Sequence, residues 1–182
     1  HLCLPYNPSQ YLLMIALTLV LTLGCASLTY ADSNSGFFWF SGGGKNGNGN
    51  FAVGFGGDNL GVEFGFIDDA NLPEGTLDYE CPHWDFTSIG NRTLKSTTGI
   101  DLLGMFHLSK HIILYGGPGL YCSHRGEVVR SNATGWYYTE TDNTYTEIAC
   151  SGGLRFTLTD NSGLGIGYHS LRGTNLTFQF SF

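Results

Sequence analysis

The stretch Asn175-Leu-Thr-Phe-Gln-Phe-Ser-Phe182 alternates polar and apolar residues without interruption. A period of two residues is typical of a β-strand, in which successive side chains point to opposite faces. One face of this strand would carry a Leu and three Phe side chains, and the other face only polar ones. The apolar face needs an apolar partner, which is a second sheet in a soluble protein and lipid in a membrane protein.

Similar alternation recurs between Asn, Asp and Gly turn signals along the rest of the chain, and it predicts an all-β fold. Residues 57–60, 109–111 and 159–163 are expected to form tight turns, whereas residues 69–95 and 124–143 are expected to form long loops. The expected strands are residues 36–43, 50–57, 60–68, 96–108, 112–123, 144–158, 163–172 and 174–182.

The tight turns and the long loops alternate along the chain. An up-and-down arrangement of the strands therefore places the tight turns at one end and both long loops at the other. Outer-membrane barrels have this asymmetry, with short periplasmic turns, long extracellular loops and an even number of strands. An open sheet edge in hydrocarbon would leave backbone groups unpaired, so the sheet is expected to close. We predict an eight-stranded antiparallel up-and-down transmembrane β-barrel.

The two faces of the expected strands also favour lipid. Charged residues make up 13% of the chain, which is about half the usual share. Positions such as Phe64 and Leu102 form a continuous apolar set, and the alternating positions, such as Glu63 and Asp101, are small, polar or ionisable. A soluble protein would bury the apolar set and expose the charges. The alternative is a secreted soluble β-sandwich that binds a ligand.

The N-terminal segment resembles an export signal. Residues 11–23 form the only long apolar run, which has the length of a signal-peptide core, and Thr29-Tyr30-Ala31 fits a small-x-small cleavage site. We expect residues 1–31 to be a cleaved signal peptide and residues 32–182 to be the barrel domain, although residues 1–10 lack Lys and Arg. Lipidation at Cys25 is the alternative processing event.

Charge and cysteine content limit the function classes. The formal net charge is −7, which argues against a nucleic-acid partner. Neither a metal site nor a cofactor is expected, because the cysteines lack CxxC spacing and a nearby pair of histidines. Cys122 and Cys150 fall on neighbouring expected strands and share a face, so a disulfide between them is one expectation. Capture of either one by Cys81, or three free thiols, are the others.

With the strands placed, the chain resembles the small OmpA/OmpX-like outer-membrane barrels of the porin family over residues 36–182. The resemblance depends on Phe178-x-Phe180-x-Phe182, on the hairpin from Gly99 to Tyr121, and on residues 165–173. It implies a place in the bacterial outer membrane, contact with lipid and lipopolysaccharide, and a C-terminal assembly signal that the barrel-assembly machinery reads at Phe178, Phe180 and Phe182. We expect a monomer.

Ionisable side chains are expected on the inner face of the wall. Buried charges must pair or change protonation, so we interpret them as an internal network that plugs a small barrel. A carboxyl group in this network would be protonated, or would pair with Arg172 or a histidine. A proton or ion path is the alternative. The set comprises Glu63, Asp101, His107, Glu147, Arg155, His169 and Gln179.

His169, Ser170 and Glu147 are the candidate residues for a hydrolase. Some outer-membrane barrels are lipid A deacylases with a His and a Ser two residues apart on the lipid-facing wall and an acid nearby. Here His169 and Ser170 are adjacent, so a strand would point them to opposite faces. We therefore expect a structural or surface-interaction protein of the cell envelope without catalysis, which contacts an extracellular ligand through the loops at 69–95 and 124–143. A lipid A-modifying enzyme is the alternative.

Overall fold

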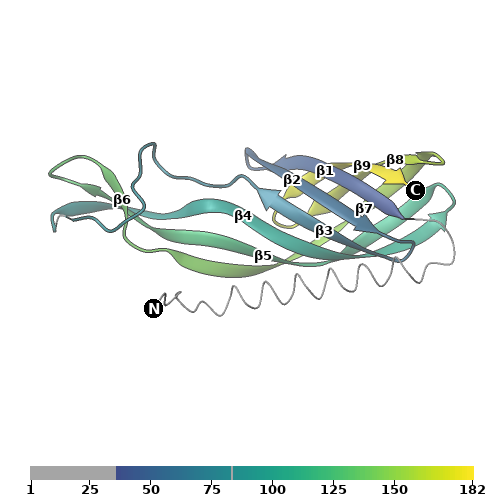
Figure 1. The fold of residues 1–182 in the computed structure, drawn as a ribbon, viewed down its shortest axis with the longest axis horizontal. Helices are drawn as coiled ribbons and strands as arrows, with labels where there is room; N and C mark the ends of the chain where they lie inside the picture. The colour runs from purple at the N-terminus through teal and green to yellow at the C-terminus, as the bar shows by residue number, and fades with distance from the viewer. Residues whose placement is uncertain (1–35, 83) are drawn as a thin grey trace, which may run out of the picture.

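The computed structural model describes residues 36–82 and 84–182 (Figure 1). The expected signal peptide, its cleavage site and Cys25 lie outside these residues. Within them, no helix is long and apolar enough to cross a membrane. The strands are β1 (Phe37–Lys45), β2 (Asn48–Gly56), β3 (Leu60–Ile67), β4 (Phe86–Ser109), β5 (Ile112–Ser131), β6 (Tyr137–Thr139), β7 (Asn143–Thr159), β8 (Ser162–His169) and β9 (Gly173–Ser181).

Eight of these strands close into a barrel. The sheet order is β4-β3-β2-β1-β9-β8-β7-β5, and β4 also pairs with β5, so the barrel wall has no free end. All of the pairings between these strands are antiparallel, including β1 with β9. The prediction of an all-β, eight-stranded antiparallel barrel is confirmed. β6 is a ninth, short strand that pairs with β5 outside the barrel.

The connections sort by length as predicted. The tight turns β2–β3, β4–β5 and β7–β8 lie at one end of the barrel, where Phe37 at the start of β1 faces Ser181 at the end of β9. At the other end, the β1–β2 hairpin turns at Asn46 and Gly47, both with positive φ (54° and 87°). This conformation is typical of a two-residue hairpin turn.

β4 and β5 are longer than predicted. Residues 86–95 and 124–131 belong to strands, although the sequence suggested parts of two loops. The β4–β5 register shifts between Ser88 and Gly90, between Thr93 and Lys95, and between Lys95 and Thr98. Each shift moves the following side chains to the other face, so the alternation that marks a strand in the sequence is lost.

The extended parts of β4 and β5 carry a distal lobe, which we define as residues 68–96 and 124–142, with residue 83 left out (Figure 1). The pairing of β3 with β4 ends at Thr97, and β4 continues for eleven residues to Phe86, or about 35 Å along the strand. The segment before β4 returns onto the lobe, because Leu77 bridges Tyr138 of β6. Buried Val128 and Val129 form part of the interior of the lobe.

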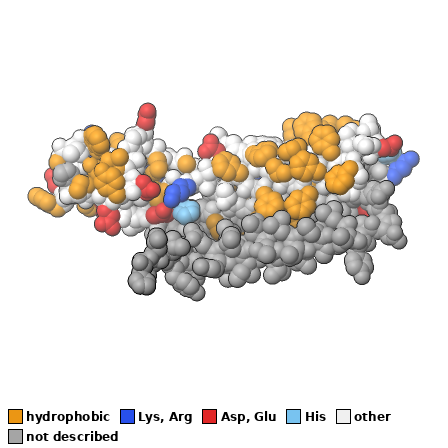
Figure 2. All heavy atoms as spheres, in the orientation of Figure 1, with side chains coloured by type: hydrophobic (Ala, Val, Ile, Leu, Met, Phe, Trp, Pro, Cys, Tyr) orange, Lys and Arg blue, Asp and Glu red, His pale blue; other side chains and the backbone are white. Residues whose placement is uncertain are grey.

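The outer wall of the barrel is apolar. Phe156, Phe178 and Phe180 are 40%, 58% and 49% exposed, whereas Glu63 and Arg155 are buried. Figure 2 shows hydrophobic side chains gathered over the barrel, with charged ones toward its two ends. This arrangement contradicts the soluble sandwich, which would bury the aromatic stripe. It is the arrangement of a wall that contacts lipid.

Glycines on the inner face accommodate the large aromatic side chains. A Cβ atom at Gly54 would overlap the indole ring of Trp39, and one at Gly65 or Gly99 would overlap Tyr121. Trp39 and Tyr121 are completely buried. An interior of eight strands has room for side chains only where opposing positions are small.

We expect Gly54→Ala to destabilise the barrel by about 1–3 kcal/mol, because Trp39 must leave its place over this glycine. Gly49→Ala is the matched control on the same strand, since nothing lies within 4 Å of a Cβ there. Urea titration of the refolded barrel in detergent, followed by the shift in gel migration between unboiled and boiled samples, measures both variants. Equal stability of the two would contradict the close fit.

Candidate functional site

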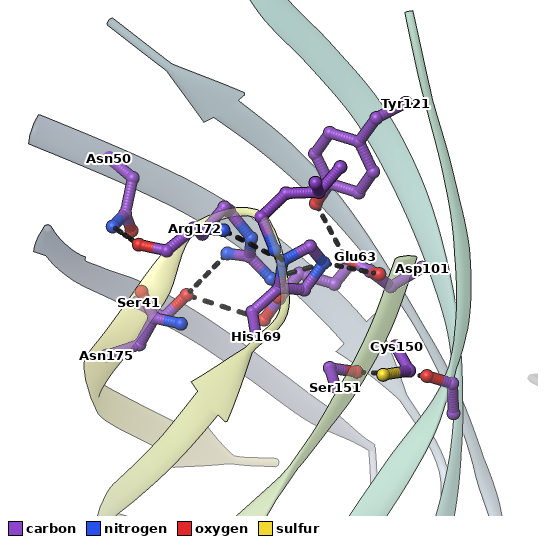
Figure 3. Close-up of polar contacts among 12 residues, drawn as sticks. Ser41, Asn50, Glu63, Asp101, Tyr121, Cys150, Ser151, His169, Arg172 and Asn175 are labelled. Atoms are coloured by element: carbon purple, nitrogen blue, oxygen red, sulfur yellow. Dashed lines mark hydrogen bonds and ion pairs between the residues drawn. The ribbon is translucent and has the colours of Figure 1, made fainter. Parts of the chain in front are cut away.

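Arg172 occupies the centre of the polar interior. It lies in the turn between β8 and β9, and its guanidinium group reaches into the barrel (Figure 3). There it forms an ion pair with Glu63 of β3, a second one with Asp101 of β4 at 3.2 Å, and a hydrogen bond to Ser41 Oγ of β1 at 3.3 Å. Arg172 therefore connects three strands of the wall from inside.

The carboxylates of Glu63 and Asp101 have further donors. Trp39 Nε1 donates to Glu63 Oε2 at 2.6 Å, and the hydroxyl of Tyr121 donates to Asp101 Oδ2 at 2.7 Å. All of these residues are buried. A buried carboxylate is tolerated only when its oxygens accept hydrogen bonds or pair with charge, and both conditions hold here.

His169 is held by both ring nitrogens. Nδ1 accepts hydrogen bonds from the backbone N–H groups of Leu171 and Arg172, at 3.1 and 3.0 Å. Nδ1 therefore carries no proton, and Nε2–H donates to Asp101 Oδ1 at 3.0 Å. These hydrogen bonds assign a neutral ring that shapes the turn and orients Asp101.

Arg155 lies elsewhere in the interior, between two aromatic rings. Its guanidinium carbon is 3.9 Å from the ring centre of Trp39 and 4.5 Å from that of Tyr115. Nη1 donates to Gln179 Oε1 at 3.3 Å. The aromatic faces stabilise the cation. With His169 neutral, the positive charges of Arg155 and Arg172 balance the negative charges of Glu63 and Asp101.

Two residues of the predicted interior set lie outside this interior. His107 is exposed near the tight turns, and its Nε2 is 3.1 Å from the carbonyl oxygen of Asp58. Glu147 is partly exposed and pairs with Arg125, which lies five residues beyond Leu120, the last residue of the apolar wall on β5. The other five residues, Glu63, Asp101, Arg155, His169 and Gln179, are buried.

The weak catalytic candidates do not converge. His169 is inside the barrel, whereas Ser170 Oγ accepts a hydrogen bond from the backbone N–H of Cys150 at 3.1 Å. Glu147 is paired with Arg125. No ring nitrogen of His169 is available to activate a nucleophile, because each is already hydrogen-bonded. This geometry speaks against a hydrolase built on His169, Ser170 and Glu147.

The predicted interior set lacks Trp39, Tyr115 and Tyr121, because it comprises polar residues only. Their signal was present, since Tyr115 and Tyr121 share the odd-numbered face of β5 with the buried Ile113 and Ser123. Arg172 was named only as a potential partner of a carboxylate. It lies in a turn, where alternation does not indicate the direction of a side chain.

The disulfide expected between Cys122 and Cys150 is wrong. All three cysteines of the described residues are free thiols. On the paired strands β5 and β7, Cys122 faces Thr146 and Cys150 faces Pro118, so the two cysteines are four positions apart. This corresponds to about 13 Å along the strand, well beyond the roughly 4.4–6.8 Å between Cα atoms that a disulfide bridges.

The terminal aromatic residues Phe178, Phe180 and Phe182 point outward and are 58%, 49% and 70% exposed. Phe178 and Phe180 form part of the lipid-facing wall on β9, and Phe182 directly follows the end of that strand. Among residues 36–82 and 84–182, no three His, Cys, Asp or Glu side chains are placed so that they could hold a metal ion.

No family model and no curated protein matches the chain. Among solved structures it is similar to Ail, the attachment invasion locus protein of Yersinia pestis, at 13% identity over 81% of this chain and 93% of that chain, with a TM-score of 0.39. Neisserial surface protein A (NspA) has 15% identity over 82% and 98%, with a TM-score of 0.38. The N-terminal β-barrel domain of Pseudomonas aeruginosa OprF has 12% identity over 82% and 98%, with a TM-score of 0.37.

With TM-scores below 0.5, the assignment depends on features of the chain itself. These are the closed antiparallel strand order, the apolar outer wall and the polar, filled interior. Together they are the architecture of a small bacterial outer-membrane β-barrel.

Proposed function

We propose that the protein is an outer-membrane barrel that holds its distal lobe above the membrane as a surface for interaction with a partner. The interior network of Arg172, Glu63 and Asp101 serves this role by fixing the barrel, and it performs no chemistry on a substrate. The barrel-assembly machinery would read Phe178, Phe180 and Phe182 during insertion, and the barrel would act as a monomer.

The position of the distal lobe carries this proposal. Tyr137 and Tyr138 belong to β6, the short strand of the lobe. They lie opposite Arg130 and Val129, nine or more residues beyond Leu120, where the apolar wall of β5 ends. That distance is about 30 Å along the strand. A lobe at this height is surrounded by water rather than lipid.

The surface of the lobe is suited to a partner. Trp84 is 94% exposed and Trp136 59% exposed. Exposed aromatic residues are enriched at protein interfaces, where they provide most of the binding free energy. The lobe holds nine Asp or Glu and four Lys or Arg, so it carries −5 of the net charge of −7. This charge favours a cationic partner over a polyanion such as sulfated sugar.

We expect the barrel in lipid vesicles to bind fluorescent polylysine more strongly than heparin at low salt. Trp84→Ala combined with Trp136→Ala should weaken polylysine binding by about 10-fold or more, since each loss of an exposed aromatic contact costs on the order of 1–2 kcal/mol. Leu102→Ala, an exposed residue of the lipid-facing wall, is the control. Unchanged binding by the double variant would contradict the proposed role of the lobe.

A further inference from the structure

A cysteine and three polar side chains share the outer face of the wall where the distal lobe joins the barrel. His124 of β5 contacts Asp142 through Nδ1 and Oδ1 at 3.1 Å, and Lys95 of β4 contacts the other oxygen of Asp142 at 3.4 Å. Cys122 lies two residues from His124 on the same face of β5, and its sulfur is 3.9 Å from the hydroxyl of Thr146 on β7.

The strand register explains why these residues meet. On β5 the even-numbered residues point outward, as the exposed Leu114 and Leu120 show. Lys95 is the direct neighbour of His124 on β4, and Asp142 directly precedes β7, whose Asn143 pairs with Arg125. Strand geometry places the Cα atoms of Cys122 and His124 about 6.5 Å apart, with both side chains on one face.

The protonation of His124 follows from its partner. A carboxylate only accepts hydrogen bonds, so Nδ1 of His124 carries the proton that it donates to Asp142. In the neutral ring, Nε2 then has a free lone pair. In His169 the proton is on Nε2 instead, and the unprotonated Nδ1 already accepts hydrogen bonds from two backbone N–H groups. His124 is 35% exposed on its side chain and can therefore act as a base toward a molecule at the surface.

The surroundings of Cys122 indicate the class of substrate. Directly toward the membrane lie Leu120 and Ile148, which are 57% and 80% exposed and pair with each other across β5 and β7. On the other side lie the polar Lys95, His124 and Asp142. The apolar wall gives way to polar residues at this level. The ester groups of a lipid lie at the corresponding boundary of the membrane, between the acyl chains and the headgroups.

We propose that Cys122, His124 and Asp142 form a site that cleaves an acyl ester of a membrane lipid through an acyl-cysteine intermediate. This inference goes beyond the proposed role of the lobe and departs from the sequence-based expectation of a protein without catalysis. That expectation considered only His169, Ser170 and Glu147, which the structure separates.

In the first step, His124 Nε2 takes the proton of the Cys122 thiol, and the sulfur attacks the ester carbonyl carbon. The carbon–oxygen bond of the ester breaks, and the lipid alcohol leaves with the proton from His124. In the second step, His124 takes a proton from water, which attacks the thioester carbon. The carbon–sulfur bond breaks, the fatty acid is released, and His124 returns the proton to the sulfur to restore the free thiol. Asp142 orients the ring and stabilises its charged form. The Thr146 hydroxyl, 3.9 Å from the sulfur, would donate to the oxyanion.

The test uses the folded full chain in vesicles of phosphatidylethanolamine and in vesicles that also contain lipopolysaccharide. Released fatty acid is measured together with the intact mass of the protein before and after neutral hydroxylamine, which cleaves thioesters. We expect fatty acid release and a hydroxylamine-sensitive acyl mass on Cys122. The lipid composition that supports release, and the mass of the acyl group, identify the source of the ester.

Cys122→Ala should abolish the release and the added mass, and His124→Ala should lower the rate by about 10²–10⁴-fold. Cys150→Ala is the matched control, because Cys150 is also an outward thiol but lies by Pro118, four positions along the wall. Boiled and unboiled gel samples verify that each variant is folded. Absence of both release and acyl mass in the unaltered protein, or release that persists in Cys122→Ala, would overturn the proposal.

Discussion

Replacing Arg172 with Met should lower the free energy of unfolding of the barrel by about 3–5 kcal/mol, the largest effect that we expect of a single substitution in the interior. The change leaves the carboxylates of Glu63 and Asp101 without their cation. Both carboxylates are buried, so water does not solvate the unpaired charges. Met is similar in length and apolar, so the loss is mainly electrostatic. Urea titration in detergent micelles, followed by tryptophan fluorescence, measures the change.

Two further variants separate this electrostatic cost from a packing defect. Glu63→Gln and Asp101→Asn introduced together with Arg172→Met remove the stranded charges, and we expect them to recover more than half of the lost stability. Arg125→Met is the matched control, because it breaks a partly exposed ion pair with Glu147 and should cost about 1 kcal/mol or less. If the triple variant were no more stable than Arg172→Met, the electrostatic explanation would be wrong.

The architecture could be predicted because alternation and turn signals are local properties of the sequence. Leu176, Phe178 and Phe180 on β9 keep their parity over the whole strand, and so do Leu164 and Ile166 on β8. In a wall that contacts lipid, every second residue of each strand must be apolar. The alternation therefore identifies both the strands and the side chains that point outward. The confirmed barrel depends on this single regularity.

The distal lobe could not be predicted in the same way. The register shifts near Ser88, Thr93 and Lys95 interrupt the alternation on β4, and both faces of the lobe contain polar residues that meet water. No apolar stripe is then required, so residues 86–95 look like a loop in the sequence. Tertiary contacts, such as the one between Asn132 and Asp85, decide that they extend a strand.

The side chains that converge on Asp101 were only partly predictable for a different reason. Alternation indicates which residues of a strand face inward, and this identified Asp101 and His169. The direction of Arg172 depends on the turn after β8, where the ring of His169 accepts two backbone N–H groups. The alternation of polar and apolar residues in the sequence does not reveal such local hydrogen bonds. The contact between His124 and Asp142 also depends on register rather than on spacing.

A charge on the outer wall should also have a large effect, because it tests which solvent the wall contacts. Ile166 lies in the middle of β8, points outward and is 51% exposed. In lipid, Ile166→Arg places a guanidinium group near the middle of the hydrocarbon and should destabilise the inserted barrel by about 2–4 kcal/mol. In water the same substitution would add a charge to an exposed position and change stability by about 0.5 kcal/mol or less.

The measurement is reversible urea unfolding from lipid vesicles, with insertion monitored by protection from added protease. Trp136→Arg is the matched control, because Trp136 is 59% exposed in the distal lobe, beyond the apolar wall, and should tolerate the charge. A similar, small effect of both substitutions would show that the outer wall faces water. A large effect at Ile166 alone follows only if the apolar wall is in contact with acyl chains, because the two positions differ in surroundings and hardly in exposure.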